Sequence, residues 1–100
     1  MREKDIEQKI VADVKSRGGM CPKWVSPGLS GVPDRIVLMP GGRIGFIEAK
    51  APGEKPGKLQ VAMHRRLRGL GFKVFVIDSM EQINTALDEI GGRNESNENE

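Results

Sequence analysis

The sequence predicts a small α/β domain with the element order αβββαβα. Three observations predict this fold class: an amphipathic helical pattern at the start, two β-type runs joined by Pro40-Gly41-Gly42, and a second helical pattern that leads into an apolar run at 72–77. A chain of 100 residues fits one domain, which excludes large barrels, two-domain clefts and repeat arrays. We expect the domain to span residues 1–90. The segment 91–100 has no apolar residue and is expected to be a disordered acidic tail.

The first helix is expected over residues 2–17, because the apolar side chains there follow helical spacing and Gly18-Gly19 ends the pattern. The apolar stripe, which covers about 140° of the helix circumference, consists of Ile6, Ile10, Val11 and Val14. Residues 20–26 predict a short strand interrupted by Pro22, and residues 26–31 carry the turn residues of a loop.

The clearest signal is a hairpin of two strands, 34–39 and 43–50. A basic loop over 51–57 and a helix over 58–70 follow. The residues expected on the buried side of this helix are Leu59, Met63, the stem of Arg66, Leu67 and Leu70. A buried strand over 72–77 and a last helix over 80–90, with Ser79 as its N-cap, complete the order.

The three-residue turn fixes the register of the hairpin and places Asp34 opposite Glu48. Two carboxylates with Cβ atoms about 5 Å apart repel each other, whereas a divalent cation between them reverses the sign of that interaction. Mg²⁺ suits such a pair because it takes oxygen ligands. Lys50 lies on the same face, two residues beyond Glu48. The alternative is that these are hairpin-end charges, with Lys50 balancing one carboxylate.

Other polar side chains depart from the packing pattern. Glu7 lies about 40° from Val11 on the helical wheel, within the apolar stripe, where a carboxylate is costly unless it is paired or binds a ligand; the alternative is a stripe-edge residue that reaches solvent. Gln60 and His64 are one turn apart and could hydrogen-bond a phosphate or a metal-bound water, although a lone His at a helix edge is more often on the surface. Trp24 is expected to anchor the core rather than to stack on a base.

The net charge of +2 conceals a basic segment. Seven Lys or Arg residues and one Glu lie between Lys50 and Lys73, which suits a phosphate backbone or, equally, a solvated helix face. The candidates for DNA backbone contact are Lys15, Arg17, Lys23, Lys55, Lys58, Arg65, Arg66 and Arg68. The single cysteine, Cys21, excludes an internal disulfide and a cysteine-based zinc site. No apolar stretch approaches the ~20 residues of a membrane span, so we expect a soluble protein of the cytoplasm.

Two short motifs carry a family resemblance. Gly31-Val32-Pro33-Asp34, followed by Ile47-Glu48-Ala49-Lys50, resembles the pattern of PD-(D/E)xK nucleases. With Glu7 on the first helix and Gln60 on the next one, the set resembles the VRR-NUC (virus-type replication-repair nuclease) family over about residues 3–78. The resemblance implies a restriction-endonuclease-like core, a mixed sheet flanked by helices, in its stand-alone phage or bacterial form.

The resemblance also implies residue roles. Asp34 and Glu48 would bind Mg²⁺ or Mn²⁺ with the carbonyl of Ala49, and Glu7 would assist the metal shell. Lys50 would orient or activate the attacking water, and Gln60 would position Lys50 or the scissile phosphate.

The expected function is therefore metal-dependent DNA endonuclease activity on branched DNA, with a homodimer resolving four-way (Holliday) junctions in a bacterial cell or phage-infected host. The alternatives are a nuclease that acts on flaps or nicked duplex and a DNA-binding module that does not cut. A module that only binds DNA would have no use for a carboxylate at Asp34 opposite Glu48.

Overall fold

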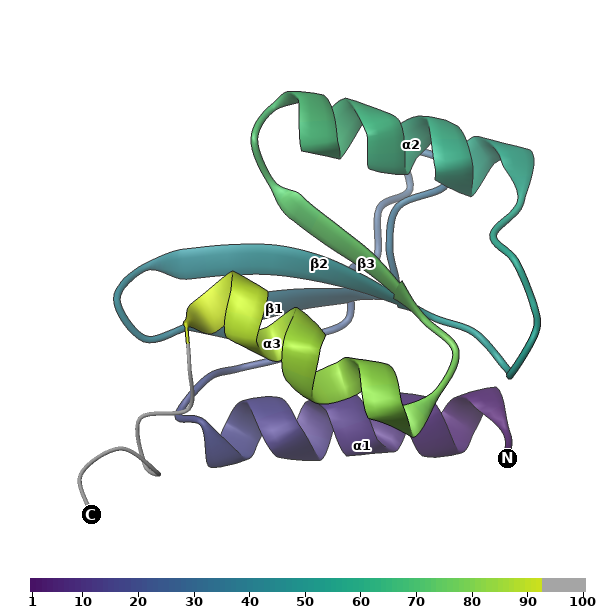
Figure 1. The fold of residues 1–100 in the computed structure, drawn as a ribbon. Coiled ribbons are helices and arrows are strands. Elements are labelled where there is room, and N and C mark those ends of the chain that lie inside the picture. Colours follow the sequence, from purple (N-terminus) through teal and green to yellow (C-terminus); the bar gives the residue numbers. More distant parts are fainter. Residues whose placement is uncertain (93–100) are drawn as a thin grey trace, which may run out of the picture.

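The computed structural model describes residues 1–92, which form a three-stranded mixed sheet with helices on both faces (Figure 1). The fold class expected from the sequence is confirmed. The elements are α1 (Glu3–Ser16), β1 (Arg35–Met39), β2 (Arg43–Ala49), α2 (Lys58–Gly69), β3 (Lys73–Ile77), a 3₁₀ turn η1 (Met80–Gln82) and α3 (Ile83–Gly91).

The sheet has the strand order β1-β2-β3. Strands β1 and β2 form the antiparallel hairpin in the expected register, with Ile36 opposite Phe46 and Leu38 opposite Ile44. Strand β3 pairs parallel to β2, and α2 makes the crossover that a parallel pair requires.

The strand expected over 20–26 is present only as an edge segment. The N–H of Met20 and the carbonyl of Leu38 form a hydrogen bond of 2.9 Å, and the reciprocal bond has the same length. Pro22 accepts a hydrogen bond from Ile36 N–H but has no N–H to return. Pairing is therefore reduced to the isolated bridges Met20–Leu38 and Lys23–Arg35.

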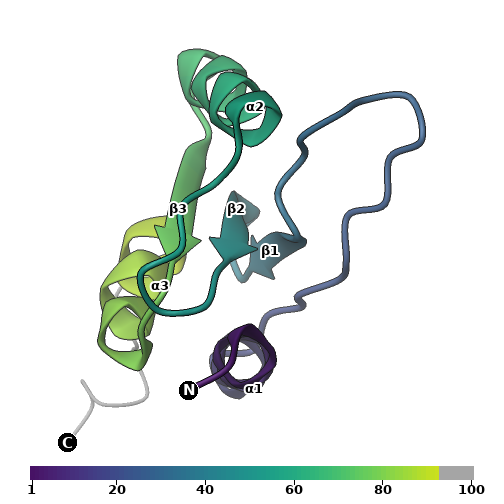
Figure 2. The same ribbon diagram turned by 90° about the vertical axis from the view of Figure 1, so that its right-hand side faces the viewer.

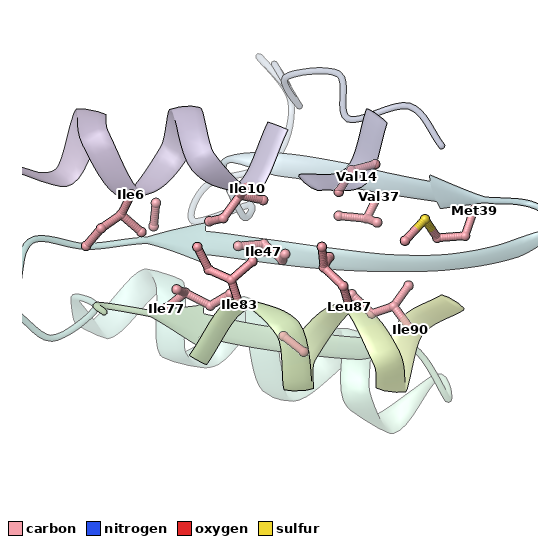
Figure 3. Packing of buried hydrophobic residues seen from close by; sticks show 12 residues of the cluster. Ile6, Ile10, Val14, Val37, Met39, Ile47, Ile77, Ile83, Leu87 and Ile90 are labelled. Carbon is pink, nitrogen blue, oxygen red and sulfur yellow. The ribbon is translucent and has the colours of Figure 1, made fainter. Parts of the chain in front are cut away.

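One face of the sheet is covered by α1 and α3, and the larger apolar core lies between them (Figures 1 and 3). Ile6, Ile10 and Val14 of α1 are fully buried there, as their spacing predicts. From α3, Ile90 packs over Gly45, where an added Cβ would lie only 2.6 Å from the Ile90 side chain. Glycine at this position of β2 thus lets α3 approach the strand.

Helix α2 covers part of the opposite face, and the 20–33 segment runs up beside the sheet toward it (Figure 2). A second core cluster unites Phe46, Met63, Leu67 and Val74, and the Trp24 ring packs at 5.0 Å from that of Phe46. Trp24 is therefore the packing anchor that we expected.

The predicted apolar stripe of α2 is wrong at both ends. Leu59 is 66% exposed and Leu70 is 75% exposed, while His64 is buried beside Met63 and Leu67. The buried face of α2 is thus rotated by one residue position from the predicted one, so that Gln60 and His64 face Glu48 of the sheet.

The last helix also differs from the expectation. Ser79 makes no side-chain capping bond, and the chain instead enters α3 through the 3₁₀ turn, where the Gln82 side chain accepts a hydrogen bond from Asp78 N–H. Helix α3 ends at Gly91, and residues 93–100 of the expected acidic tail lie outside the described residues. Within residues 1–92, the helices are too short or too polar for any of them to traverse a bilayer.

Candidate active site

The candidate active site lies where β1 begins and β2 ends, below the first turns of α2. Asp34 directly precedes β1, and continuing the hairpin register by one residue from the Arg35–Ile47 pair places it opposite Glu48. The Asp34 carboxylate accepts a hydrogen bond of 2.8 Å from Ala49 N–H, while the Ala49 side chain is buried in the core on the other face. The hairpin and the core together fix the peptide between Glu48 and Lys50.

Glu48 is almost completely buried, with 1% of its surface exposed. Its Oε2 accepts a hydrogen bond of 2.7 Å from Gln60 Nε2, and Lys50 Nζ lies 3.4 Å from the same oxygen. The structure therefore brings together four of the predicted residues, Asp34, Glu48, Lys50 and Gln60.

Both carboxyl groups are held in an unfavourable electrostatic environment. Burial, together with the nearby Asp34 carboxylate, raises the pKa of Glu48 to about 7, against the opposing effects of Lys50 and Gln60. Burial also raises the pKa of Asp34 above its ordinary value, although the hydrogen bond from Ala49 N–H lowers it. Two adjacent carboxyls with raised pKa values favour a proton or a cation between them.

Glu7 forms an ion pair with Arg35, and its negative charge also contributes to the raised pKa of Asp34. Arg35 Nε lies 2.8 Å from Glu7 Oε2, and both side chains are largely buried. Arg35 also donates a hydrogen bond of 2.9 Å to the carbonyl of Cys21, which ties α1 to the edge segment. The sequence reasoning missed Arg35. Its position next to Asp34 on the α1-facing side of β1 was the available signal, since a buried carboxylate needs a partner.

Within residues 1–92, no group of three or more His, Cys, Asp and Glu side chains is arranged to hold a metal ion. The pairing of Glu7 with Arg35 leaves two carboxylates at the site. Two carboxylates suit Mg²⁺, which keeps several water ligands and commonly uses only one or two protein carboxylates. Among the described residues, Glu48 Oε1 moreover finds no hydrogen-bond partner although it is buried, so one oxygen of this carboxylate is free to bind a cation.

His64 is buried rather than on the surface, with 2% of the residue exposed. Its Nε2 lies 3.8 Å from Glu48 Oε1. Gln60 and His64 are one turn apart on the same face of α2, so both of these polar side chains face Glu48.

The loop before β1 sets the position of α2 at the site. Gly31 adopts φ +78°, and a Cβ there would collide with the Leu59 carbonyl and lie 2.9 Å from Gln60 N. Only glycine combines this backbone conformation with such a close approach. Gly31 thus holds the first turn of α2, including Gln60, against the loop that leads to Asp34.

The candidate DNA contacts are not all equally placed. Arg17 forms an ion pair within the fold: its side chain is 7% exposed, and its Nη1 lies 2.7 Å from Asp88 Oδ1. Lys15 is exposed but lies near the end of α1, where Gly18 approaches Pro40 at the hairpin turn, at the opposite end of β1 from Asp34. Arg68 is exposed and donates a hydrogen bond to the Val74 carbonyl.

The remaining candidates are exposed. Lys55 lies in the loop after Lys50, and Lys58 is the first residue of α2. The others are Lys23 on the edge segment and Arg65 and Arg66 on the outer side of α2.

On this mixed sheet, an aspartate precedes one strand and Glu-Ala-Lys lies at the end of the next. This arrangement defines a nuclease of the PD-(D/E)xK class. A solved structure described as "VRR_NUC domain" superimposes with a TM-score of 0.79 at 34% identity, over 87% of this chain and 94% of that one. "Putative nuclease p44" of Acyrthosiphon pisum secondary endosymbiont phage 1 is 51% identical over 81 residues, which are 81% of this chain and 87% of that protein. A scan against family models gave no match.

The chain belongs to the VRR-NUC family of nucleases.

Proposed function

We propose that the protein is a divalent-metal-dependent DNA endonuclease that acts as a homodimer on four-way (Holliday) junctions. The observation that carries the proposal is Glu48, a buried carboxylate opposite Asp34, with Lys50 Nζ 3.4 Å from it. Keeping two carboxylates close together in a buried position destabilises a fold unless they bind a proton or a cation. The phage origin of the relative supports action in the cytoplasm of a bacterial cell or a phage-infected host.

The donor set fits Mg²⁺ or Mn²⁺. Asp34 and Glu48 would hold the ion, with the carbonyl of Ala49 as a third ligand. When bound, the ion supplies positive charge that acidifies water and stabilises the negative charge of the transition state. Glu7 is a less direct contributor than the family resemblance implies: through Arg35 it holds the β1 end of the site.

The protein residues position the reaction. Lys50, beside Glu48, orients the attacking water and offsets charge on the phosphate, and Gln60 holds Glu48 in place. Attack of water oxygen on phosphorus breaks the bond to the 3′ oxygen, which takes up a proton. The products are a 5′-phosphate and a 3′-hydroxyl.

The exposed cations near the site are proposed to contact the DNA backbone. These exposed cations are Lys55 and Lys58, which follow Lys50 in the chain, with Lys23, Arg65 and Arg66. Backbone contacts carry no base information, so the protein would recognise DNA shape rather than sequence. One subunit offers one site, and paired cuts across a junction call for a second site, most simply in a C₂ dimer.

The test compares a labelled four-way junction with a linear duplex of the same arm sequence, in Mg²⁺, in Mn²⁺ and in EDTA. Asp34→Asn removes one proposed ligand, and Asp13→Asn is the matched control, because within residues 1–92 the Asp13 carboxylate pairs only with Lys9, one turn away on α1. Symmetric paired cuts on the junction alone are expected, lost in EDTA and in Asp34→Asn but retained in Asp13→Asn.

Other outcomes replace parts of the proposal. Equal cutting of both substrates would remove the structure preference, and preferential cutting of a flap or nicked duplex would replace the junction as substrate. Binding without cutting in either metal would leave a DNA-binding module. A monomer by sedimentation at the concentration that gives paired cuts would refute the homodimer.

A further inference from the structure

Two buried polar atoms in the protein face each other without a hydrogen bond. His64 Nε2 and Glu48 Oε1 lie 3.8 Å apart, and within residues 1–92 they are the two buried side-chain atoms that lack a partner. A buried polar atom without a partner destabilises the fold, because it has lost its hydrogen bonds to water and gained none in return. Such an arrangement is rare in native proteins and calls for an explanation.

The two atoms are complementary in their chemistry. A neutral imidazole that carries its proton on Nε2 donates a hydrogen bond, and a carboxylate oxygen accepts one. The separation exceeds a normal N–H···O distance by less than about 1 Å, so a small rotation of either side chain completes the bond.

Helix α2 therefore presents one donor to each oxygen of the same carboxylate. Gln60 Nε2 donates to Oε2 at 2.7 Å, and His64 Nε2 faces Oε1. The terminal torsion of a glutamate is broad and roughly two-fold, so a single donor leaves the carboxylate plane poorly fixed. Donors on both oxygens fix that plane.

Packing alone does not explain the histidine. Met63 and Leu67, its neighbours on the buried face of α2, belong to an apolar cluster. A leucine at position 64 would fill this space without bringing a buried polar nitrogen beside a carboxylate.

We propose that His64 is a positioning residue which, together with Gln60, fixes the orientation of the Glu48 carboxylate for cation binding. The inference deepens the proposed function and rests on it, in that Glu48 is taken as a ligand. Partners that orient a metal ligand typically contribute 10–100-fold to metal affinity or activity.

The first test uses His64→Leu, which removes the donor and keeps an apolar volume, and His64→Gln, which keeps an amide donor at a similar distance from the backbone. Mn²⁺ binding is measured by calorimetry without DNA, and kcat and KM are measured on the junction. His64→Leu is expected to bind Mn²⁺ at least about 10-fold more weakly and to lose kcat rather than KM, while His64→Gln recovers most of both. In a Glu48→Gln background, His64→Leu is expected to change neither quantity further.

Urea unfolding separates positioning from a folding defect, because His64→Leu is expected to be at least as stable as the wild type. Unchanged Mn²⁺ affinity and kcat in a folded His64→Leu protein would refute the proposal. Equal losses in the folded leucine and glutamine variants would refute the donor role as well.

The second test does not depend on metal or activity. His64 is the only histidine, so a ¹H–¹⁵N correlation spectrum of the imidazole reports its tautomer directly. The proton is expected on Nε2, with a resonance that shifts in Glu48→Gln. A proton on Nδ1 alone would overturn the inference even in an active enzyme. A wild-type protein that neither binds Mn²⁺ nor cuts DNA would refute the proposed function, and the spectrum would still test the contact between His64 and Glu48.

Discussion

Replacing Glu48 by glutamine is expected to stabilise the protein in the absence of divalent metal. The pKa of Glu48 rises from 4.5 to about 7 in the fold. The folded chain thus keeps this proton up to about pH 7, while the unfolded chain loses it near pH 4.5. Rising pH therefore destabilises the fold across this window, by about 3 kcal/mol in total at about 1.4 kcal/mol per pH unit. The amide of the Glu48→Gln variant carries no charge at any pH in this window and escapes this cost.

Trp24 provides the assay, because it is the only tryptophan and packs against Phe46 in the second core cluster. Urea unfolding is followed by fluorescence at pH 5 and pH 8 in EDTA, and the free energy of unfolding is obtained by linear extrapolation. Glu48→Gln is expected to exceed the wild type by up to about 3 kcal/mol at pH 8, and by little at pH 5. Mg²⁺ at pH 8 should stabilise the wild type but not the variant.

Several groups that face Glu48 titrate or carry charge, so the comparison is made between variants at each pH. Asp34, Lys50 and His64 are present in both proteins. Because the pKa of His64 is lowered in the fold, its contribution to stability increases as pH rises toward 6.5, which is opposite to the effect of Glu48. Glu54→Gln, in the exposed loop, is the matched control and should leave stability unchanged. A Glu48→Gln protein no more stable than the wild type at pH 8 would refute the electrostatic reasoning.

Three further predictions concern residues other than the two carboxylates. Gly31→Ala should lower the free energy of unfolding by at least about 2 kcal/mol, because of its positive φ and its contact with the Leu59 carbonyl, whereas Gly28→Ala, with open space around it, should be tolerated. Burial raises the pKa of Cys21 to about 11, so at pH 8 iodoacetamide should alkylate the folded protein roughly 100-fold more slowly than the urea-unfolded chain; equal rates would contradict this. Arg17→Ala should cost about 1–3 kcal/mol, because it removes the bonds to α3, yet leave DNA affinity unchanged; lost affinity in a stable variant would return Arg17 to the DNA contacts.

The hairpin was the most predictable part of the site. A three-residue turn and period-2 alternation are enough to set the register, and they place Asp34 opposite Glu48 and Lys50 beside it. The register depends on local geometry alone, so no knowledge of the remaining fold was needed. The first helix was predictable for the same reason, since Ile6, Ile10 and Val14 follow one unambiguous stripe.

Contacts between distant segments were less accessible to sequence reasoning. Glu7 stands out as a carboxylate within an apolar stripe, and that anomaly is equally consistent with a metal ligand and with an ion pair. The structure pairs it with Arg35, 28 positions away. Pairing of this kind depends on where α1 packs on the sheet, which the helical pattern does not specify.

Helix α2 shows most directly why apolar periodicity fails near a functional site. The stripe through Leu59, Met63, Leu67 and Leu70 is regular, yet both terminal leucines are exposed. A purely hydrophobic orientation would bury these leucines and turn Gln60 and His64 away from the sheet, leaving Glu48 with only Lys50 beside it. Because an unpaired buried carboxylate costs more than an exposed leucine, the helix turns by one residue. The departure from the apolar pattern thus follows from burying Glu48. The rotation of α2 that gives Glu48 Oε2 a hydrogen bond from Gln60 also brings His64 to Glu48 Oε1.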